Sequence, residues 1–280
     1  MERKITTTRD GVSLSFLTGG RGRDLLMLGG WSQAATLFTG QFEAFAQSHR
    51  IVALDNRGHG ESAKPGDGYR IQRLAKDLFD VIVYLGLHDF DLVAHSLSVS
   101  MTWAYLDMFG PERPPRRLVL IDEPAALLAR PDWPDTEAAQ AGAVIPSLEA
   151  MSGLLEAVRN TRTVDDHLAI VGGMFSERIN IADRTALATE NLKLPREYAA
   201  RLIENNVLQD WRPLLPNIHQ TSLIFAGEAS IHPLESQAYV AKSMPNAQLE
   251  VIPAAMGGSH FLMYENPDLF NRKALAFLNG

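Results

Sequence analysis

Apolar residues form six short runs of strand length along the chain, and polar or turn residues bound each run. The runs fall at positions 25–28, 51–54, 92–94, 118–121, 223–226 and 249–252. Continuous apolar runs of this length are typical of strands that are buried on both faces. Stretches with helical periodicity stand between several of them, at 72–85, 97–109, 234–244 and 268–278. Strands and helices alternating in this way predict a mostly parallel, twisted sheet with helices on both faces.

Two shorter segments near the start of the chain have a different pattern. They cover positions 5–8 and 12–17 and flank the dipeptide Asp10-Gly11. Asp-Gly between two strand-like segments is a strong signal for a tight hairpin. We therefore predict an antiparallel pair at one edge of the sheet.

The alternation of strand and helix stops between positions 124 and 216. This region is rich in Ala, Leu and Glu, has helical periodicity and is interrupted by Pro131, Pro134, Pro146 and Pro195. A helical insertion between two strands of such a sheet is expected to lie over the carboxyl ends of the strands, where α/β sheets bind ligands. We therefore divide the chain into a core of residues 1–124 and 217–280 and a helical cap, or lid, of residues 125–216.

Composition narrows the class of protein further. With 280 residues, of which 46% are apolar, the chain can bury a large core. The formal net charge of −7 and the lack of a Lys/Arg run argue against nucleic acid or a membrane as partner. The chain has no cysteine for a disulfide or thiolate metal site, and no apolar segment resembling a signal peptide or membrane span. We expect a cytoplasmic protein without a metal or other cofactor, and the residues leave its oligomeric state open.

Ser96 is the first candidate for chemistry. It follows the apolar run 90–95 and precedes a helical stretch, with the small residues Ala94 and Ser98 two positions to either side. A nucleophilic serine on a strained strand-to-helix turn needs small neighbours at these two positions, which are commonly glycines. The pentapeptide alone also fits a serine that caps the helix beginning at Leu97.

A serine hydroxyl needs a base, and His260 is the strongest candidate among eight histidines. It lies in the loop Gly257-Gly258-Ser259-His260-Phe261, between the last predicted strand and the last helix. Loops at the carboxyl ends of parallel strands converge on the edge where Ser96 is expected. A histidine that merely caps the final helix is the alternative. We expect His95 to point away from Ser96, and His232 remains a second candidate because it follows a strand.

Over almost its whole length the chain resembles proteins of the α/β-hydrolase fold. Four features carry the resemblance: Gly29-Gly30-Trp31 after a strand, Asp55-Asn56-Arg57-Gly58-His59-Gly60-Glu61-Ser62, the turn at Ser96, and Gly258-Ser259-His260 followed by Glu265-Asn266-Pro267. The resemblance implies that Ser96 is the nucleophile and His260 the base. It also implies an oxyanion hole formed by the backbone N–H groups of Trp31 and Leu97, which would stabilise the negative charge that develops on the substrate.

The acid of the expected triad departs from the family pattern. Most members carry it in the loop after the strand 223–226, and this chain has Ser230 at that position. A hydroxyl does not stabilise an imidazolium as a carboxylate does. We predict Asp122, at the end of the preceding strand, in an arrangement similar to that of haloalkane dehalogenases and some lactonases. Glu123 and Glu228 are alternatives, and Asp122 could instead cap the first turn of the lid.

Serine and histidine together imply acyl transfer to the serine, followed by hydrolysis. We therefore predict a carboxylic ester hydrolase, an esterase or lactonase, that acts on a small-molecule ester or lactone; acyl-homoserine lactones are one plausible class by analogy. A serine nucleophile disfavours halide displacement, which needs a carboxylate. The substrate pocket is expected to include Gly30, Glu123, Trp133, Met151, Met174 and Phe175.

Two other functions fit parts of the sequence. A small branch of the fold consists of cofactor-independent dioxygenases that open quinolone rings with a His–Asp pair, and this chain is similar to it in Gly110-Pro111-Glu112-Arg113. That branch has His-Ser-His-Gly-Gly at the elbow, whereas this chain has His95-Ser96-Leu97-Ser98-Val99. The other alternative is a non-catalytic binding protein, in which Ser230 would mark a decayed triad.

Overall fold

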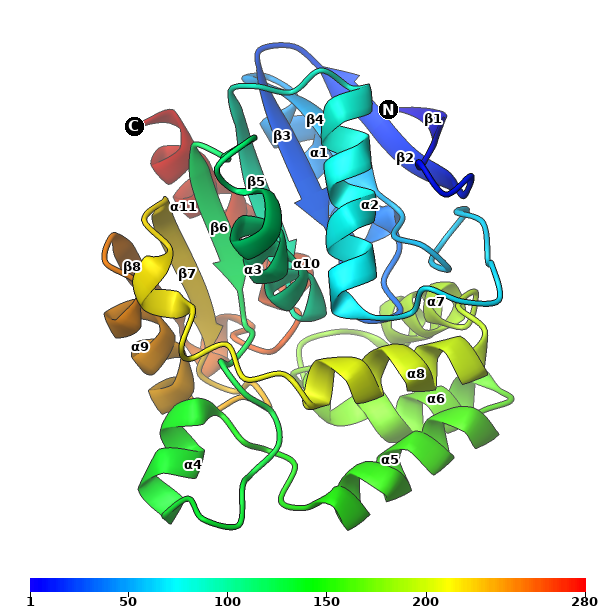
Figure 1. Ribbon diagram of the computed structural model, residues 1–280, viewed down its shortest axis with the longest axis vertical. Coiled ribbons are helices and arrows are strands. Elements are labelled where there is room, and N and C mark those ends of the chain that lie inside the picture. Colours follow the sequence, from blue (N-terminus) through cyan, green and yellow to red (C-terminus); the bar gives the residue numbers. More distant parts are fainter.

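The computed structural model describes residues 1–280 and places the strands in one eight-stranded sheet (Figure 1). The strands are β1 (Glu2–Thr7), β2 (Ser13–Gly20), β3 (Arg23–Leu28), β4 (His49–Leu54), β5 (Phe90–His95), β6 (Arg117–Ile121), β7 (Thr221–Gly227) and β8 (Ala247–Ile252). Their order across the sheet is β1-β2-β4-β3-β5-β6-β7-β8. β1 and β2 form an antiparallel hairpin at one edge, β2 is antiparallel to β4, and every other pair is parallel. The predicted hairpin and mostly parallel sheet are confirmed.

Helices cover both faces of the sheet, which explains why its central strands are apolar along their whole length. Every residue of β5 is buried, for example. Figure 1 shows α2 and α3 in front of the sheet and α1 and α11 behind it. The helices of the core are α1 (Thr39–Phe45), α2 (Ile71–Tyr84), α3 (Leu97–Phe109), α9 (Leu234–Ser243), α10 (Leu262–Glu265) and α11 (Pro267–Asn279). None of the helices is both long and apolar enough to cross a lipid bilayer.

The segment between β6 and β7 contains no strand and forms the predicted helical lid. Its helices are α4 (Asp135–Ala141), α5 (Leu148–Asn160), α6 (Val164–Val171), α7 (Ile181–Asn191) and α8 (Arg196–Val207). In Figure 1, α5 to α8 lie beyond the arrowheads of the parallel strands, over their carboxyl ends. A single apolar cluster includes Val93 of the sheet together with Val158 and Leu187 of the lid. The lid therefore packs as a continuation of the core, and the exact boundaries between the two, at 124 and 217, stay a prediction.

Candidate active site

Ser96 occupies the turn between β5 and α3. Its backbone has φ +51° and ψ −133°, a conformation that residues other than glycine rarely adopt. The Ser96 N–H donates to the carbonyl of Ile121 at the end of β6, 2.8 Å away, which holds the turn against the neighbouring strand. The residues around Ser96 are buried, whereas Ser96 itself is half-buried. This is the geometry of a nucleophile elbow, which presents the hydroxyl at the carboxyl end of the sheet.

Ser98 stands at a position of the elbow that is commonly glycine, and its side chain is held by hydrogen bonds. Its hydroxyl donates to the carbonyl of Gly29 at 2.5 Å and accepts from the side chain of Asn56 at 3.2 Å. The first bond ties the start of α3 to the loop after β3, which leads into Trp31. A serine is compatible with the elbow here because its hydroxyl is buried and hydrogen-bonded on both sides.

The structure brings His260 and Asp122 together, as the sequence predicted. Nδ1 of His260 lies 2.6 Å from Oδ2 of Asp122, and both side chains are buried. Ser230, at the position that usually carries the acid, donates its hydroxyl proton to the same oxygen at 2.5 Å. Glu228 is exposed and accepts instead from the backbone N–H of Ala254 at 2.8 Å. Of the carboxylates considered, Asp122 is the one that contacts the histidine.

This contact leaves His260 suited to accept a proton. Because Nδ1 of His260 donates its proton to Asp122, the other ring nitrogen of His260, Nε2, carries the lone pair. Burial lowers the pKa of His260 below its ordinary value of 6.5, so the ring is neutral at neutral pH. No hydrogen bond joins Ser96 Oγ to His260, but both residues line the same cavity. Contacts of this kind commonly tighten only when substrate is bound.

Two further histidines surround His260. The ring of His232 meets it edge-on with centroids 5.3 Å apart, and the ring of His95 lies 4.7 Å away. Nε2 of His95 is 2.9 Å from the backbone carbonyl of His260, so it donates a proton and braces the loop that carries the base. His95 is buried as expected, but it also lines the cavity. Burial lowers the pKa of His95 to about 3 and that of His232 to about 4, so neither adds a positive charge beside the base.

Asp122, His232 and His260 are also the residues that could hold a metal ion. One donor atom from each lies within 4.8 Å of the others. Two imidazoles and a carboxylate form a donor set that divalent transition metals bind. Here Asp122 Oδ2 and His260 Nδ1 are already bonded to each other, so a metal on these atoms would compete with that contact.

The backbone beside Ser96 is arranged as an oxyanion hole would require. A Cβ atom on Gly30 would come within 2.8 Å of Ser96 Cβ, so glycine lets the loop after β3 pass directly against the nucleophile. The next residue is Trp31, and Leu97 follows Ser96 as the first residue of α3. The backbone N–H groups of Trp31 and Leu97 have no acceptor within the protein. Two free donors beside a nucleophile suit the binding of a developing oxyanion.

The lid holds this loop in place. The indole N–H of Trp31 donates to the carbonyl of Ala199 on α8 at 2.8 Å. Ser32, the following residue, has a positive φ of +63°. With its amide oriented to satisfy its neighbours, Asn191 of α7 donates to the Ser32 carbonyl at 3.1 Å. The loop that carries one candidate oxyanion donor is thus bonded to two helices of the lid.

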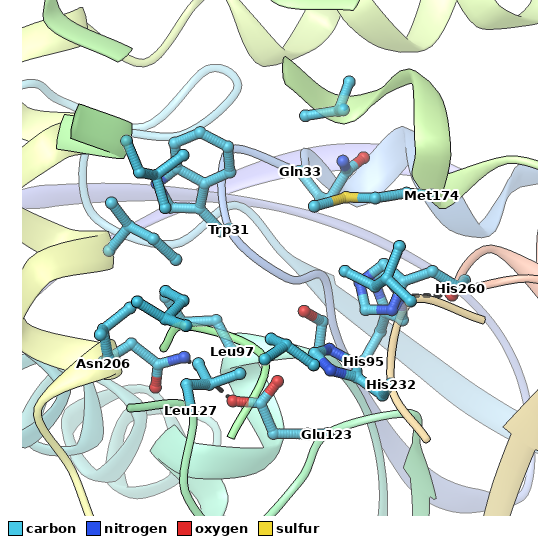
Figure 2. A pocket seen from close by; sticks show the side chains of 18 of the residues that line it. Trp31, Gln33, His95, Leu97, Glu123, Leu127, Met174, Asn206, His232 and His260 are labelled. Carbon is cyan, nitrogen blue, oxygen red and sulfur yellow. Dashed lines mark hydrogen bonds between the residues drawn. The ribbon is translucent and has the colours of Figure 1, made fainter. Parts of the chain in front are cut away.

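A cavity of about 160 Å³ opens over Ser96 between the sheet and the lid (Figure 2). Figure 2 shows Trp31 and Met174 on one side of it and Glu123, His95 and His232 on the other. Its walls are mostly apolar: Trp31, Leu97, Leu127, Val144, Ile145, Leu154, Val171, Met174, Ile203, Val207, Ile231 and Phe261. An apolar cavity of roughly 150 Å³ has the size that accepts a benzene ring. The space therefore suits a small apolar group attached to the reacting carbonyl.

Comparison with known proteins decides the family. A family model described as the alpha/beta hydrolase family matches residues 25–273, most of the chain. The protein is an α/β hydrolase. The fold class and the resemblance found in the sequence are confirmed.

Relatives of this α/β hydrolase have several names. A protein from Synechocystis sp., named a putative non-heme chloroperoxidase, is 29% identical and covers 82% of this chain and 81% of its own. The 2-hydroxymuconate semialdehyde hydrolase of Pseudomonas putida is 31% identical, covering 83% of this chain and 78% of its own. Among solved structures, a bromoperoxidase from Bacillus anthracis has a TM-score of 0.88 at 19% identity, with 100% of both chains covered. An esterase from Exiguobacterium antarcticum has a TM-score of 0.85 at 19% identity over 99% of both chains. The structures support the fold along the whole chain.

Four of the predicted pocket residues of the α/β hydrolase do not line its cavity, and three of them, Trp133, Met151 and Phe175, pack elsewhere in the lid. Trp133 lies at the lid surface, where Arg130 and Arg212 stack on its ring at 5.2 and 3.9 Å from the centroid. Met151 is buried in the apolar cluster that joins the lid to the core. Phe175 stacks on Phe261, with centroids 4.6 Å apart, and so supports the cavity wall from behind. These side chains were expected in the pocket because they are large and apolar, and packing within the lid uses them instead.

Two of the other predicted pocket residues line the cavity, and several residues that line it were not predicted. Glu123 and Met174 line it, and Gly30 lies against Ser96. The residues that sequence reasoning missed include Gln33, Leu127, Val144, Ile145, Asn191, Ile203, Asn206, Val207 and Ile231. Positions 203, 206 and 207 follow the spacing of one helix face, which was a usable signal. The orientation of that face toward the cavity depends on how α8 packs.

Proposed function

We propose that this α/β hydrolase is a serine hydrolase that cleaves a small carboxylic ester or lactone through an acyl-enzyme. The observation that carries the proposal is the buried contact of 2.6 Å between Asp122 and His260 at a cavity that also exposes the strained Ser96. A neutral histidine oriented by a carboxylate beside a serine is the arrangement that activates a hydroxyl.

The proposed reaction begins when His260 takes the hydroxyl proton of Ser96 and Oγ bonds to the carbonyl carbon. The backbone N–H groups of Trp31 and Leu97 stabilise the resulting oxyanion, and one such donor contributes about 3 kcal/mol to lowering the barrier. The oxyanion collapses, the bond to the leaving oxygen breaks, and that oxygen takes the proton from His260. Water then attacks the acyl-enzyme with His260 as base, which releases the acid and restores Ser96. Asp122 holds the imidazole and stabilises its charged form throughout.

The cavity favours small substrates within this class. Its volume of about 160 Å³ suits an aryl group or a short acyl chain, and its walls offer no cationic clamp for a phosphate or nucleotide. Acyl-homoserine lactones with short chains fit this description better than those with long chains. Two of the similar proteins carry names consistent with hydrolysis, one a hydrolase and the other an esterase.

Acid release from a panel of aryl esters, short aliphatic esters and acyl-homoserine lactones, measured in a pH-stat, tests the proposal. Release by the wild type that is lost in Ser96→Ala supports a serine hydrolase and ranks its substrates. If no member of the panel is cleaved, the quinolone dioxygenase and the binding protein become the better hypotheses. Oxygen consumption with a 3-hydroxyquinolone then separates those two.

A second candidate is perhydrolysis, in which hydrogen peroxide replaces water as the acceptor of the acyl group. The name of the Synechocystis relative favours testing it. The same acyl-enzyme would transfer its acyl group to peroxide and release a peracid. Peracid formed from a carboxylic ester and peroxide, and absent in Ser96→Ala, supports this activity.

A further inference from the structure

The two carboxyl groups at the end of β6, those of Asp122 and Glu123, contact different parts of the site. Asp122 contacts His260 and Ser230, as described above. Glu123, the next residue, turns to the cavity and lies in its floor beside Asn206 (Figure 2). The proposed reaction uses Asp122 and leaves Glu123 without a role.

Glu123 belongs to a polar group built into an otherwise apolar wall. Its Oε1 accepts from the hydroxyl of Ser100 at 3.0 Å and from the side-chain amide of Asn206 at 2.9 Å. Its other oxygen, Oε2, accepts from neither of these groups. Glu123 and Asn206 are each only 3% exposed, and Oδ1 of Asn206 is buried without a partner. Glu123 therefore presents a carboxyl acceptor in the cavity wall, and the Asn206 amide holds that carboxyl in place.

Packing alone gives no reason for a carboxyl group at this place. Burying an ionisable group without an opposite charge is costly, and the groups that bind Glu123 are neutral. Burial raises the pKa of Glu123 to about 7, even though hydrogen bonds from Asn206 and Ser100 oppose the rise. An apolar residue of similar size would avoid this cost. A carboxyl group at this place is therefore expected to bind a ligand in the cavity.

We propose that Glu123 and Asn206 form a subsite that binds a hydrogen-bond donor, a hydroxyl or N–H group, on the carbon next to the scissile carbonyl. The inference rests on the proposed function, because it places the substrate by its bond to Ser96. The Ser96 hydroxyl is itself a neighbour of the Glu123 carboxyl. Once the carbonyl carbon is bonded to Ser96 Oγ, the substituent on the adjacent carbon is the part of the acyl group that can reach Oε2. The preferred substrates are therefore 2-hydroxy or 2-amido esters and lactones.

A matched pair of esters tests the subsite. Ethyl 2-hydroxybutanoate and ethyl butanoate differ by one hydroxyl and share the same reaction. For the wild type at pH 8, kcat/KM is expected to be at least about tenfold higher for the hydroxy ester, because the donor pairs with an ionised buried acceptor. The ratio should fall below pH 7 as the carboxyl becomes protonated. Glu123→Gln keeps the size and one acceptor oxygen but not the charge, and should bring the ratio to within about threefold of one.

The control is Glu177→Gln, which changes an exposed carboxyl of the lid and should leave the ratio and its pH dependence as in the wild type. A general structural role of Glu123 would lower kcat/KM for both esters equally, and an unchanged ratio in Glu123→Gln would overturn the subsite. So would equal cleavage of the two esters by the wild type.

Binding separates the subsite from the proposed function. Ligand-observed NMR on Ser96→Ala should show stronger binding of the hydroxy ester than of ethyl butanoate, and the preference should disappear in the Ser96→Ala, Glu123→Gln double variant. A binding preference without hydrolysis by the wild type would overturn the serine hydrolase and keep the subsite. Hydrolysis by the wild type without any preference for the hydroxy ester would overturn the subsite and keep the serine hydrolase.

Discussion

Ser230 and His260 share one acceptor, Oδ2 of Asp122, at 2.5 and 2.6 Å. The side chain at position 230 thus touches the carboxylate that orients the proposed base, although a hydroxyl has replaced the usual acid there. We expect Asp122→Asn to lower kcat by about 10⁴-fold, because the amide no longer stabilises the imidazolium. Adding Ser230→Asp to this variant should recover at least about tenfold, since the new carboxylate would lie within reach of His260 Nδ1.

Steady-state rates with ethyl butanoate check this prediction. Glu123→Gln serves as the comparison and should cost less than about tenfold on the same ester, because Glu123 does not contact His260. A larger loss in Glu123→Gln than in Asp122→Asn would mean that the acid has been assigned to the wrong residue.

Ser96→Ala should abolish hydrolysis and leave the fold intact. Loss of the nucleophile is expected to lower kcat by at least about 10⁴-fold. The free energy of unfolding, measured with urea, should stay within about 1 kcal/mol of the wild type, because the Ser96 side chain is small and only half-buried. Ser152→Ala, at an exposed position of α5, is the matched control and should retain full activity. A rate of hydrolysis by Ser96→Ala that is close to the wild-type rate would contradict a serine nucleophile.

The rate should depend on pH through His260. Burial holds the pKa of this histidine below 6.5, so its neutral form persists from alkaline pH to below that value. For ethyl butanoate, kcat/KM is expected to be constant near neutral pH and to fall on acidification only below pH 6.5. Profiles of the wild type and of Glu123→Gln should agree in this acid limb. A half-maximal rate above pH 7 in both proteins would be incompatible with a buried, neutral base.

Glu123 should make the folded protein less stable as the pH rises, whereas the rate falls as the pH is lowered. Its pKa is raised from 4.5 to about 7 in the folded protein, so the folded state binds the proton more tightly than the unfolded state. This contribution is fully present below pH 4.5 and is lost as pH rises to 7. From pH 5 to pH 8, we expect the free energy of unfolding of Glu123→Gln to gain about 2 kcal/mol relative to the wild type. Urea unfolding of both proteins at the two pH values measures the gain, and a constant difference would show that Glu123 does not titrate in this range.

Trp31→Phe tests the bond between the oxyanion loop and the lid. Phenylalanine keeps an apolar ring in the cavity wall but cannot donate to the Ala199 carbonyl. The unfolding free energy should fall by about 1 kcal/mol for the lost hydrogen bond and its unpaired carbonyl. We also expect kcat to fall by about tenfold, because the backbone N–H of residue 31 is less well positioned. Trp133→Phe, at the lid surface, should keep the wild-type kcat, and equal effects of the two changes on kcat would argue against the link.

Local patterns in the sequence were sufficient for the sheet, the hairpin at Asp10-Gly11 and the elbow at Ser96, because burial on both faces and a strained turn restrict which residues are allowed. A carboxylate after strand 118–121 near His260 was also expected, since both lie at carboxyl ends of parallel strands, but Asp122 was preferred to its neighbour Glu123 through the family resemblance. The cavity walls did not follow in the same way. Trp133 is apolar enough for a pocket, but two arginines hold it at the lid surface. Which face of a lid helix meets the cavity depends on packing between distant segments, and the chain pattern does not specify it.

The bond from the Trp31 indole to α8 limits how this α/β hydrolase can change during evolution. In the proposed function the sheet supplies the catalytic residues, and residues of the lid line the cavity that selects the substrate. Here α8 also fixes the residue proposed to supply half of the oxyanion hole, so one helix contributes to both selection and rate. Grafting the lid of a relative onto this sheet would alter turnover even for a substrate that both cavities admit, and compensating changes would be needed at position 31 and its neighbours.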